Sequence, residues 1–366
     1  MKWIITSVEA AMPKVSINSA SYENCRAAID QVFELFSPDL AGKKVLVKPN
    51  VLRESRPEDG IATHPAVLRT VVERVEQENP AAIVVGDNPG AFSYGANEAS
   101  FHATGLLEAA KGYYQNIGTE PVDVEFNPTF VDRVRISRAV LEADIIISLP
   151  KFKTHGLTTI TGAIKNSYGF IPGAQKARLH LIAGDPWRFG ELIVDVFSLR
   201  VPELYIVDAV VGMEGNGPAS KELRQIGRIM ASDNAVTLDA AIALMMGLEP
   251  GKLRFLQVAK QRGLGDFDPA TVELVGGLEE IPDFRLPPMA LKAEDISPGI
   301  TEFLTGRTRL RPSVDEALCT GCGTCVEQCP ASALSLNSGL PEVDTDKCIT
   351  CFCCQEICPE TAIKLG

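Results

Sequence analysis

Short apolar runs rich in β-branched residues recur between residues 44 and 208, and each run ends at Gly, Pro, Asn or a charged residue. Runs of this length and composition are typical of buried β-strands that end in loops. The four clearest runs cover residues 45–47, 83–85, 145–147 and 204–207. The segments between them, such as residues 65–78, are long enough for crossover helices. The pattern therefore predicts an α/β fold with a mostly parallel sheet flanked by helices.

The same pattern continues with a predicted helix at residues 233–246 and a predicted strand at residues 272–275, which complete the large domain. Between Pro282 and Pro312 the chain carries further prolines and the arginine cluster Arg307, Arg309 and Arg311, which is typical of a segment that crosses between domains. We therefore expect three parts. They are an α/β domain at residues 1–290, a linker at residues 291–313 and a small cysteine-rich domain at residues 314–366.

Composition and charge restrict the class of protein. Apolar residues make up 45% of the 366 residues and charged residues 22%, which is typical of folded globular domains. The formal net charge of −12, without a long run of Lys or Arg, argues against a nucleic-acid partner because phosphates would be repelled. The N-terminus lacks the apolar core of a signal peptide, and no apolar stretch reaches the roughly 18 residues of a membrane span. These features predict a cytoplasmic protein with no membrane span.

Nine of the ten cysteines lie between Cys319 and Cys358, and their spacing repeats at an offset of 29 residues. Each repeat reads Cys-x-x-Cys-x-x-Cys-x-x-x-Cys-Pro, an internal duplication typical of two-cluster ferredoxins. In such modules the fourth cysteine of each repeat binds the cluster of the other repeat. The spacing predicts two 4Fe-4S clusters in a small α+β ferredoxin-like domain. The expected ligands are Cys319, Cys322, Cys325 and Cys358 for the first cluster, and Cys348, Cys351, Cys354 and Cys329 for the second.

Alternatives exist for this cysteine-rich segment. A pair of zinc sites also uses four cysteines at short spacing, although zinc sites rarely interleave in this way. Cys353 lies between two expected ligands and is interpreted as a thiol packed near the second cluster, whereas Cys25 stands alone and is expected to be buried. Residues 313–366 include eight acidic and two basic residues. Either a soluble electron donor or acceptor protein with a basic surface docks there, or the acidic face is simply solvated.

Polar residues follow the predicted strands at their carboxyl ends, where open α/β sheets bind ligands. The lysines among them, in an otherwise acidic protein, favour an anionic small molecule, either a phosphate or a carboxylate. The alternative is that these lysines cap loops or pair with nearby carboxylates. No Walker loop or Gly-x-Gly-x-x-Gly motif indicates ATP or NAD. The expected substrate-binding residues are Lys48, Asn50, Asp87, Lys151, Lys165, Asn166, Asp208 and Asn216, and the expected catalytic residues are His155, Lys153 and Glu214.

Four motifs carry a family resemblance. They are Val-Lys-Pro-Asn at residues 47–50, Leu-Pro-Lys-Phe-Lys-Thr-His at residues 149–155, Thr-Gly-Ala-Ile-Lys-Asn at residues 161–166 and Met-Glu-Gly-Asn-Gly-Pro at residues 213–218. In these motifs the chain resembles the family called domain of unknown function 362, over about residues 44–246. Members of that family often carry a C-terminal ferredoxin module and are described as iron-sulfur proteins of unknown activity. The resemblance implies the architecture and leaves the substrate open.

A redox module joined to a polar cleft suggests an oxidoreductase. In this hypothesis a soluble donor protein supplies electrons through the clusters, and an anionic substrate is reduced at the strand ends. His155 or Glu214 would exchange protons with the substrate, since histidine titrates near neutral pH. Two rival functions fit the same residues. One is a non-enzymatic electron carrier or assembly factor, and the other is a cluster-independent isomerase whose ferredoxin part senses redox state.

Overall fold

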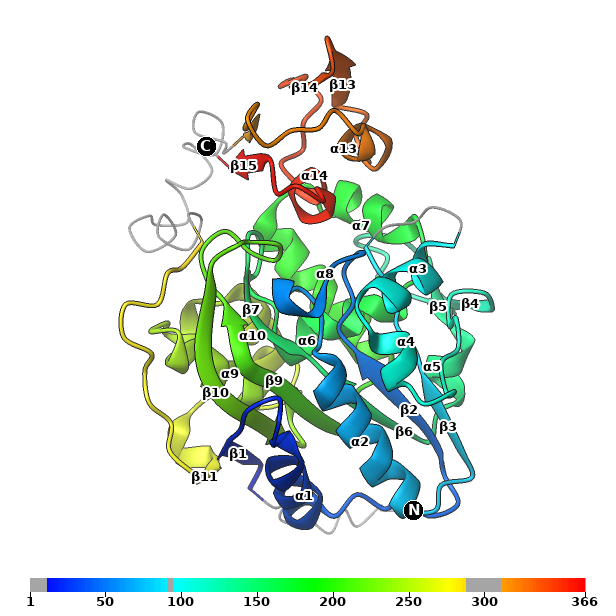
Figure 1. Ribbon diagram of the computed structural model, residues 1–366, viewed down its shortest axis with the longest axis vertical. Coiled ribbons are helices and arrows are strands. Elements are labelled where there is room, and N and C mark those ends of the chain that lie inside the picture. The colour runs from blue at the N-terminus through cyan, green and yellow to red at the C-terminus, as the bar shows by residue number, and fades with distance from the viewer. Residues whose placement is uncertain (1–11, 91–94, 288–310, 366) are drawn as a thin grey trace, which may run out of the picture.

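The computed structural model describes residues 12–90, 95–287 and 311–365 (Figure 1). Within these ranges a nine-stranded sheet forms the centre of the large domain, with the strand order β11-β1-β10-β9-β6-β2-β3 and with β7 and β8 beside β9. Its strands are β1 (Lys14–Ser19), β2 (Lys44–Pro49), β3 (Ala82–Val85), β6 (Ile145–Leu149), β7 (Lys151–His155), β8 (Thr159–Ile160), β9 (Leu204–Met213), β10 (Leu223–Ser232) and β11 (Glu273–Val275).

The middle of this sheet is parallel, as the sequence predicts. Strands β9, β6, β2 and β3 pair in parallel, whereas β10 pairs antiparallel with both β9 and β1. The four predicted strands are confirmed, and β9 continues to Met213, well beyond the predicted end at residue 207. The polar segment 151–155, expected to follow a strand, instead forms strand β7 with all five residues buried. The predicted strand at residues 272–275 corresponds to β11.

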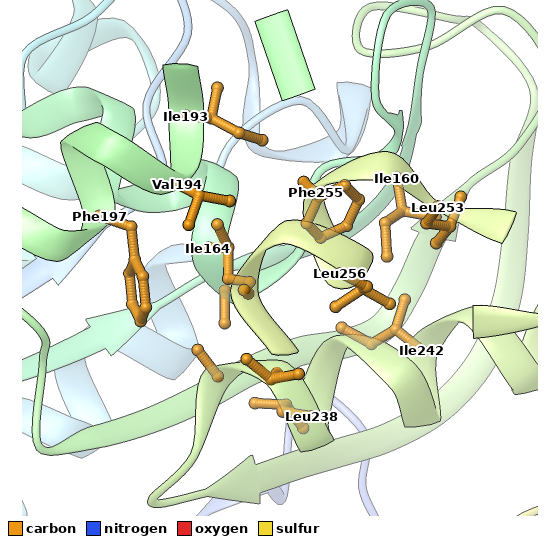
Figure 2. Packing of buried hydrophobic residues seen from close by; sticks show 14 of the residues in the cluster. Ile160, Ile164, Ile193, Val194, Phe197, Leu238, Ile242, Leu253, Phe255 and Leu256 are labelled. Atoms are coloured by element: carbon orange, nitrogen blue, oxygen red, sulfur yellow. The ribbon is translucent and has the colours of Figure 1, made fainter. Parts of the chain in front are cut away.

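Alternating side chains of the parallel strands pack on opposite faces of the sheet. In β9, Leu204 and Ile206 join one apolar cluster, whereas Tyr205 and Val207 join another. Helices α1 (Cys25–Phe36) and α2 (Pro65–Gln77) cover the first face, and helices α8 (Pro186–Leu199), α9 (Ala235–Met245) and α10 (Arg254–Gln261) cover the second. Figure 2 shows the second cluster, in which side chains from α8, α9 and α10 interdigitate. Both faces of the sheet are therefore covered, which explains the uninterrupted apolar runs in the sequence.

The remaining helices are short. Those of the large domain are α3 (Ala96–Ala103), α4 (Leu106–Ala109), α5 (Arg138–Glu142), α6 (Gly162–Asn166) and α7 (Gln175–Ala183), and a separate ribbon pairs β4 (Pro121–Glu125) with β5 (Arg133–Ser137). The helix predicted at residues 65–78 corresponds to α2, and the one predicted at residues 233–246 corresponds to α9.

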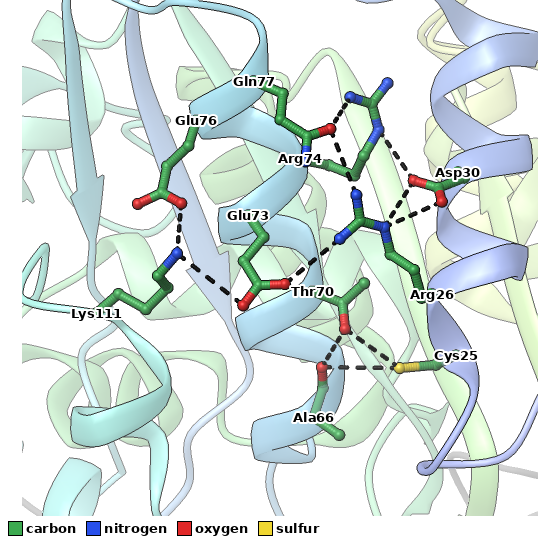
Figure 3. Close-up of polar contacts among 10 residues, drawn as sticks. All are labelled: Cys25, Arg26, Asp30, Ala66, Thr70, Glu73, Arg74, Glu76, Gln77 and Lys111. Carbon is green, nitrogen blue, oxygen red and sulfur yellow. Dashed lines mark hydrogen bonds and ion pairs between the residues drawn. The ribbon is translucent and has the colours of Figure 1, made fainter.

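Helices α1 and α2 are joined by a polar network at their surface (Figure 3). Arg26 lies 3.0 Å from Asp30 on its own helix and 3.4 Å from Glu73 on α2. Beneath this network Cys25 is 2% exposed, and its thiol lies 3.5 Å from the Thr70 hydroxyl. The prediction that Cys25 is buried is confirmed, and burial raises the pKa of its thiol.

The C-terminal domain consists of two small antiparallel pairs and two short helices. The pairs are β12 (Pro312–Val314) with β15 (Ile363–Leu365) and β13 (Leu334–Asn337) with β14 (Leu340–Val343), and the helices are α13 (Thr324–Glu327) and α14 (Cys353–Ile357). Helix α14 faces the large domain, whereas β13 and β14 lie at the far end of the molecule (Figure 1).

The predicted linker at residues 291–313 lies largely outside the described residues, so the proposed domain boundaries stay predictions. Within the described ranges, no helix combines the length and the apolar character that a membrane crossing requires.

Candidate redox site and adjoining cleft

Two cavities in the C-terminal domain are each lined by four cysteines. The first cavity is lined by Cys319, Cys322, Cys325 and Cys358. The second cavity is lined by Cys329, Cys348, Cys351 and Cys354. These are the two interleaved ligand sets that the spacing predicts, and none of the ten cysteines forms a disulfide. Each cavity has an empty volume of about 340 Å³, including the part open to solvent, as expected if both hold the same kind of group.

Backbone amides support one cysteine of each set in the same way. Ala333 N donates to Cys329 Sγ at 3.3 Å, and Ala362 N donates to Cys358 Sγ at 3.3 Å. Amide donors of this kind stabilise thiolates that bind iron-sulfur clusters and tune their potentials. The rest of the lining is mostly apolar, with residues such as Leu334 and Ile363. The donor set therefore fits two 4Fe-4S clusters, which supply one-electron transfer when they are bound.

The two repeats share an unusual backbone conformation but fill it with different residues. Gly321 and Gly323 in the first repeat have φ values of 69° and 78°, a left-handed conformation that glycine adopts without strain. Thr350 and Phe352, 29 positions later, hold the same conformation with φ values of 57° each. Phe352 is 2% exposed and belongs to the apolar core cluster of the α/β domain. We interpret Phe352 as an anchor that docks the second repeat on the large domain and offsets the strain of its backbone.

Helix α14 provides the polar contacts of the same interface. Gln355 Nε2 donates to the carbonyl oxygen of Asn216 at 2.7 Å, and Arg53 Nε donates to the carbonyl oxygen of Glu356 at 3.2 Å. The carboxylate of Glu356 lies 3.1 Å from Nε2 of His155 on β7. His155 Nδ1 accepts a hydrogen bond from the amide of Leu157 at 3.1 Å, so Nε2 carries the proton that faces Glu356.

A cleft lies where α14 meets the carboxyl ends of the parallel strands, with an empty volume of about 650 Å³ including the part open to solvent. The α/β domain contributes Asn50, Asp87, Lys165, Asn166, Tyr168, Lys176 and His180 to its lining. The C-terminal domain contributes Gln328, Cys353, Glu356 and Ile357. The cleft therefore joins residues predicted to bind substrate with residues that adjoin the second cavity.

One wall of the cleft is a buried polar network. Lys48 Nζ lies 2.7 Å from Asp87 Oδ1 and 3.2 Å from Asn166 Oδ1, which also accepts from Asn50 Nδ2 at 3.1 Å. Gly169 lies against the same ion pair, and a Cβ atom there would lie 2.0 Å from Asp87 Oδ1. Only glycine permits this close approach, which keeps the pair packed beside the cleft.

Lys165 lines the cleft without a hydrogen bond or an ion pair to any described residue. Among the residues that the structure describes, its ammonium group contacts aromatic rings instead, at 4.7 Å from the ring centre of Tyr168 and 5.5 Å from that of Phe189. Burial lowers the pKa of Lys165, while the charge of Glu356 opposes this shift. An anion bound beside Lys165 would stabilise its charged form.

Two further lysines donate to backbone carbonyl groups. Lys153 donates to the carbonyl oxygen of Ile61 at 2.7 Å, and burial together with the charge of Lys165 lowers its pKa to about 7. Lys176 donates to the carbonyl oxygens of Asn88 and Pro89, and burial also lowers its pKa to about 7. Both lysines gain and lose protons near neutral pH, so their charge responds to any anion nearby.

The two histidines near the cleft are neutral, whereas the carboxylate of Glu356 is ionised. Burial lowers the pKa of His155, and it lowers the pKa of His180 to about 3, so both rings are neutral at pH 7. Burial alone would raise the pKa of Glu356, but its hydrogen bond to His155 and the charge of Lys165 lower it to about 2. The cleft lining thus combines two carboxylates, Asp87 and Glu356, with two lysines, Lys165 and Lys176.

Comparison with known proteins supports both halves of this arrangement. Residues 45–244 match the family described as Domain of unknown function (DUF362), and residues 311–359 match the 4Fe-4S dicluster domain. The chain belongs to the DUF362 family.

Two curated proteins and one solved structure are similar to parts of this DUF362 protein. A Thylakoid-associated protein of Synechocystis sp. is 32% identical over 248 residues, which cover 64% of this chain and 71% of that protein. A Probable ferredoxin of Methanosarcina thermophila is 67% identical over 24 residues, which cover 7% of this chain and 41% of the ferredoxin. A crystal structure of a Thermotoga maritima protein aligns with a TM-score of 0.38 and 11% identity, over 62% of this chain and 59% of that one. The chain thus spans less than two thirds of that structure and of the ferredoxin.

The DUF362 domain brings only part of the predicted substrate site together. Asn50, Asp87, Lys165 and Asn166 line the cleft, and Lys48 pairs with Asp87 behind them. His155 lies next to the cleft, 3.1 Å from the lining residue Glu356. Lys153 is near enough for the charge of Lys165 to lower its pKa, as it does for His155.

Four further predicted site residues, Lys151, Asp208, Glu214 and Asn216, also lie outside the cleft lining. Lys151 Nζ pairs with Asp208 at 2.8 Å and with the Tyr22 hydroxyl at 2.9 Å, so this ion pair is internally satisfied. Glu214 is held by Arg224 and Arg285, and although burial opposes the shift, these hydrogen bonds lower its pKa. A carboxylate held by two arginines is a poor proton donor near neutral pH. Asn216 touches the C-terminal domain through its carbonyl oxygen.

Sequence reasoning missed Asp239, which holds the helix that carries Lys165. Asp239 accepts hydrogen bonds from the amides of Ala163 and Ile164 at 2.5 and 3.0 Å. Gly162 adopts a φ of 57°, and a Cβ atom there would lie 2.3 Å from Asp239 Oδ1. Because Asp239 lies on α9, far along the chain, only the folded structure reveals this role. Tyr168, Lys176 and His180 were missed in the same way.

The Asp239 carboxyl gives a testable dependence of stability on pH. Burial raises its pKa from 3.8 to about 7, so the folded state holds a proton that the unfolded state loses between pH 4 and 7. The contribution of this group, about 4 kcal/mol, is therefore full below pH 4 and is lost as the pH rises through 7. We expect wild type to lose stability relative to Asp239→Asn as the pH rises from 5 to 8, because asparagine does not ionise. Urea denaturation at the two pH values measures the unfolding free energy of each protein. A difference that does not change with pH would contradict the assignment.

Proposed function

We propose that this DUF362 protein is an oxidoreductase that passes electrons through two 4Fe-4S clusters to an anionic small molecule in the cleft. One observation carries the proposal. Cys353 and Glu356, on the helix that begins directly after Cys351 and Phe352, line the same cleft as Lys165. A substrate held at Lys165 would therefore lie beside the second cavity, where one-electron transfer is available.

The charges of the cleft favour an anion. Lys48 is already paired with Asp87, and Lys176 and Lys153 are bound to carbonyl oxygens, whereas Lys165 contacts only aromatic rings among the described residues. Lys165 is only partly exposed, so its ammonium group is costly without a counter-charge, and an anionic ligand reduces that cost. Asn50 adds an unpartnered, buried side-chain oxygen that accepts a hydrogen bond from the ligand. These features support a small anion that also carries an N–H or O–H group.

Proton delivery is assigned to Lys153 and His155. A two-electron reduction takes up two electrons, supplied one at a time by a donor protein, and two protons, so that the substrate gains both and releases no group. Lys153, with a pKa of about 7, can exchange protons near neutral pH. His155 carries its proton on Nε2, facing Glu356 at the edge of the cleft. Lys48, Asn50, Asp87 and Asn166 orient the substrate.

The proposed partner is a soluble electron donor or acceptor protein with a basic surface, and we keep the cytoplasm as the predicted location. A second candidate function is a non-enzymatic electron carrier or assembly factor. One observation favours it, because the lysines beside the second cavity would also compensate the negative charge of a bound cluster. The two functions differ in whether any small molecule is turned over.

Reoxidation of the reduced protein distinguishes these functions. The protein is purified without oxygen, reduced with dithionite, freed of excess reductant and mixed with fractions of small anionic metabolites, while cluster absorbance is followed. We expect one fraction to reoxidise wild type. Lys165→Met should raise the concentration needed for half-maximal rate by about tenfold, since one charged hydrogen bond is lost.

Lys347→Met is the matched control, because Lys347 follows Asp346 beside Cys348 but its side chain is 63% exposed and pairs with Asp344. This control should reoxidise like wild type. If no anionic fraction reoxidises the protein, the oxidoreductase proposal fails and the carrier function is supported. If Lys165→Met behaves like wild type, the anion site lies elsewhere.

A further inference from the structure

We infer that electrons cross the C-terminal domain in one direction, from the cluster site in the first cavity to the cluster site in the second cavity, and then into the cleft. The inference rests on the proposed function in one respect, since it takes the cleft as the place where electrons leave. It adds the order of the two sites, the residues that set this order, and the surface where the donor protein docks.

The first cavity faces solvent. Its cysteine Cys322 is exposed, and its lining includes the exposed residues Leu336 and Glu360. Leu336 lies on β13, which together with β14 is at the end of the molecule farthest from the large sheet (Figure 1). A protein partner can therefore approach the first cavity directly.

The second cavity faces the α/β domain instead. Phe352 lines this cavity and at the same time belongs to the buried core cluster that contains Tyr168 and Phe189. Its neighbour Cys353 lines the cleft. Because Phe352 occupies this interface, a second protein has no comparable access to the inner side of the second cavity.

Lysines that are partly or fully shielded from solvent favour reduction at the second cavity. Reduction adds one negative charge, so nearby positive charge raises the reduction potential, and burial keeps solvent and salt from screening it. Lys165 and Cys353 both line the cleft, and Lys153 is near enough to interact electrostatically with Lys165 and Glu356. Of the carboxylates on this side, Asp87 is paired with Lys48, and the charge of Glu356 is opposed by that of Lys165. Lys153 and Lys176 have no carboxylate partner among the described residues.

Negative charge predominates among the groups around the first cavity. Glu360 lines it and is exposed to solvent. Arg53 is a buried cation near Cys358, and its charge is opposed by Asp59 and Glu360. We therefore expect the first site to have the lower potential, so that an electron arriving from outside moves downhill to the second site.

The exposed surface around the first cavity also defines the donor. It combines the exposed apolar side chains of Leu318 and Leu336 with exposed carboxylates such as Glu316 and Glu360, while the basic Lys364 is already paired with Asp315. An apolar centre with an acidic rim complements a one-electron carrier that has an apolar contact spot and a basic rim. Such a carrier is the partner that the surface fits.

Redox titration followed by EPR on the anaerobic holoprotein tests the order. Cys322→Ser, which changes a first-cavity ligand, identifies the signal that belongs to that site. We expect the other signal, from the second cavity, to have the higher potential in wild type. Lys165→Met should lower the potential of the second site and leave the first unchanged, and Lys347→Met, which removes an exposed lysine near Cys348, should shift it less.

Lys153→Met provides an independent variant if Lys165→Met does not fold, and iron content shows whether both sites are filled. A higher potential at the first site in wild type, an equal shift of both sites, or no shift in either lysine variant would overturn the inference. The titration needs no substrate, so its failure is separate from that of the proposed function. If the potentials have the expected order but no anion reoxidises the protein, the proposed substrate is wrong and the proposed direction of electron transfer still holds.

Discussion

Replacing Cys354 by alanine is expected to lower the iron content of anaerobically prepared protein from about eight atoms per chain to about four. Cys354 lines the second cavity with three other cysteines, and a 4Fe-4S cluster that loses one of its four thiolates is not retained in full. Iron and sulfide assays give the content. EPR of the reduced variant should show one isolated signal, because the magnetic interaction between two reduced clusters is lost.

The adjacent residue provides the control. Cys353 is in the same helix but lines the cleft and neither cavity, so Cys353→Ala should keep about eight irons. Equal loss of iron in both variants would show that the assignment of ligands is wrong. Zinc in place of iron in the wild-type protein would overturn the cluster assignment as a whole.

Replacing Phe352 by glycine is expected to loosen the contact between the two domains by about 3 kcal/mol. The change removes a large side chain from the α/β core cluster, and this cost exceeds the gain from relieving the left-handed backbone at this position. We expect the holoprotein to unfold in two steps by differential scanning calorimetry instead of one, and the segment between the domains to become more sensitive to protease.

Leu336→Ala tests whether this effect is specific. Leu336 belongs to the same domain but is 45% exposed, so its replacement should change stability by less than about 0.5 kcal/mol. If Phe352→Gly unfolds like wild type in a single step, Phe352 does not anchor the domains. An equal loss in Leu336→Ala would mean that the small domain itself, rather than its docking, is the sensitive part.

The sequence predicts the sheet well because strands buried on both faces need continuous β-branched runs. The runs at residues 45–47 and 145–147 have this pattern and form strands β2 and β6. The sequence predicts β7 poorly because this strand lacks a continuous apolar run. Lys151, Lys153 and His155 are polar, yet all are buried in a strand that is satisfied by tertiary partners. Local sequence preference cannot report such partners, which come from elements far along the chain.

The same limit applies to the site. Lys151 and Lys153 are two positions apart and are expected to act together, but the strand register shifts between them, since Lys151 pairs with Asp208 and Lys153 with Met213. Lys151 is thereby bound in a separate ion pair. Spacing alone does not reveal such an irregularity. Glu356 was missed because its role depends on how two domains dock, whereas the cysteine sets follow from short-range spacing and are brought together as expected.

The exchange of Gly323 for Phe352 at matching positions of the duplicated domain has one more consequence. Two nearly equivalent halves could dock on a partner surface in two orientations related by a half-turn. A bulky aromatic side chain on one half, and none on the other, leaves one orientation in which the hydrophobic socket is filled. The duplication supplies two equal cluster loops, and this single difference in side-chain volume gives the domain a fixed polarity on its host.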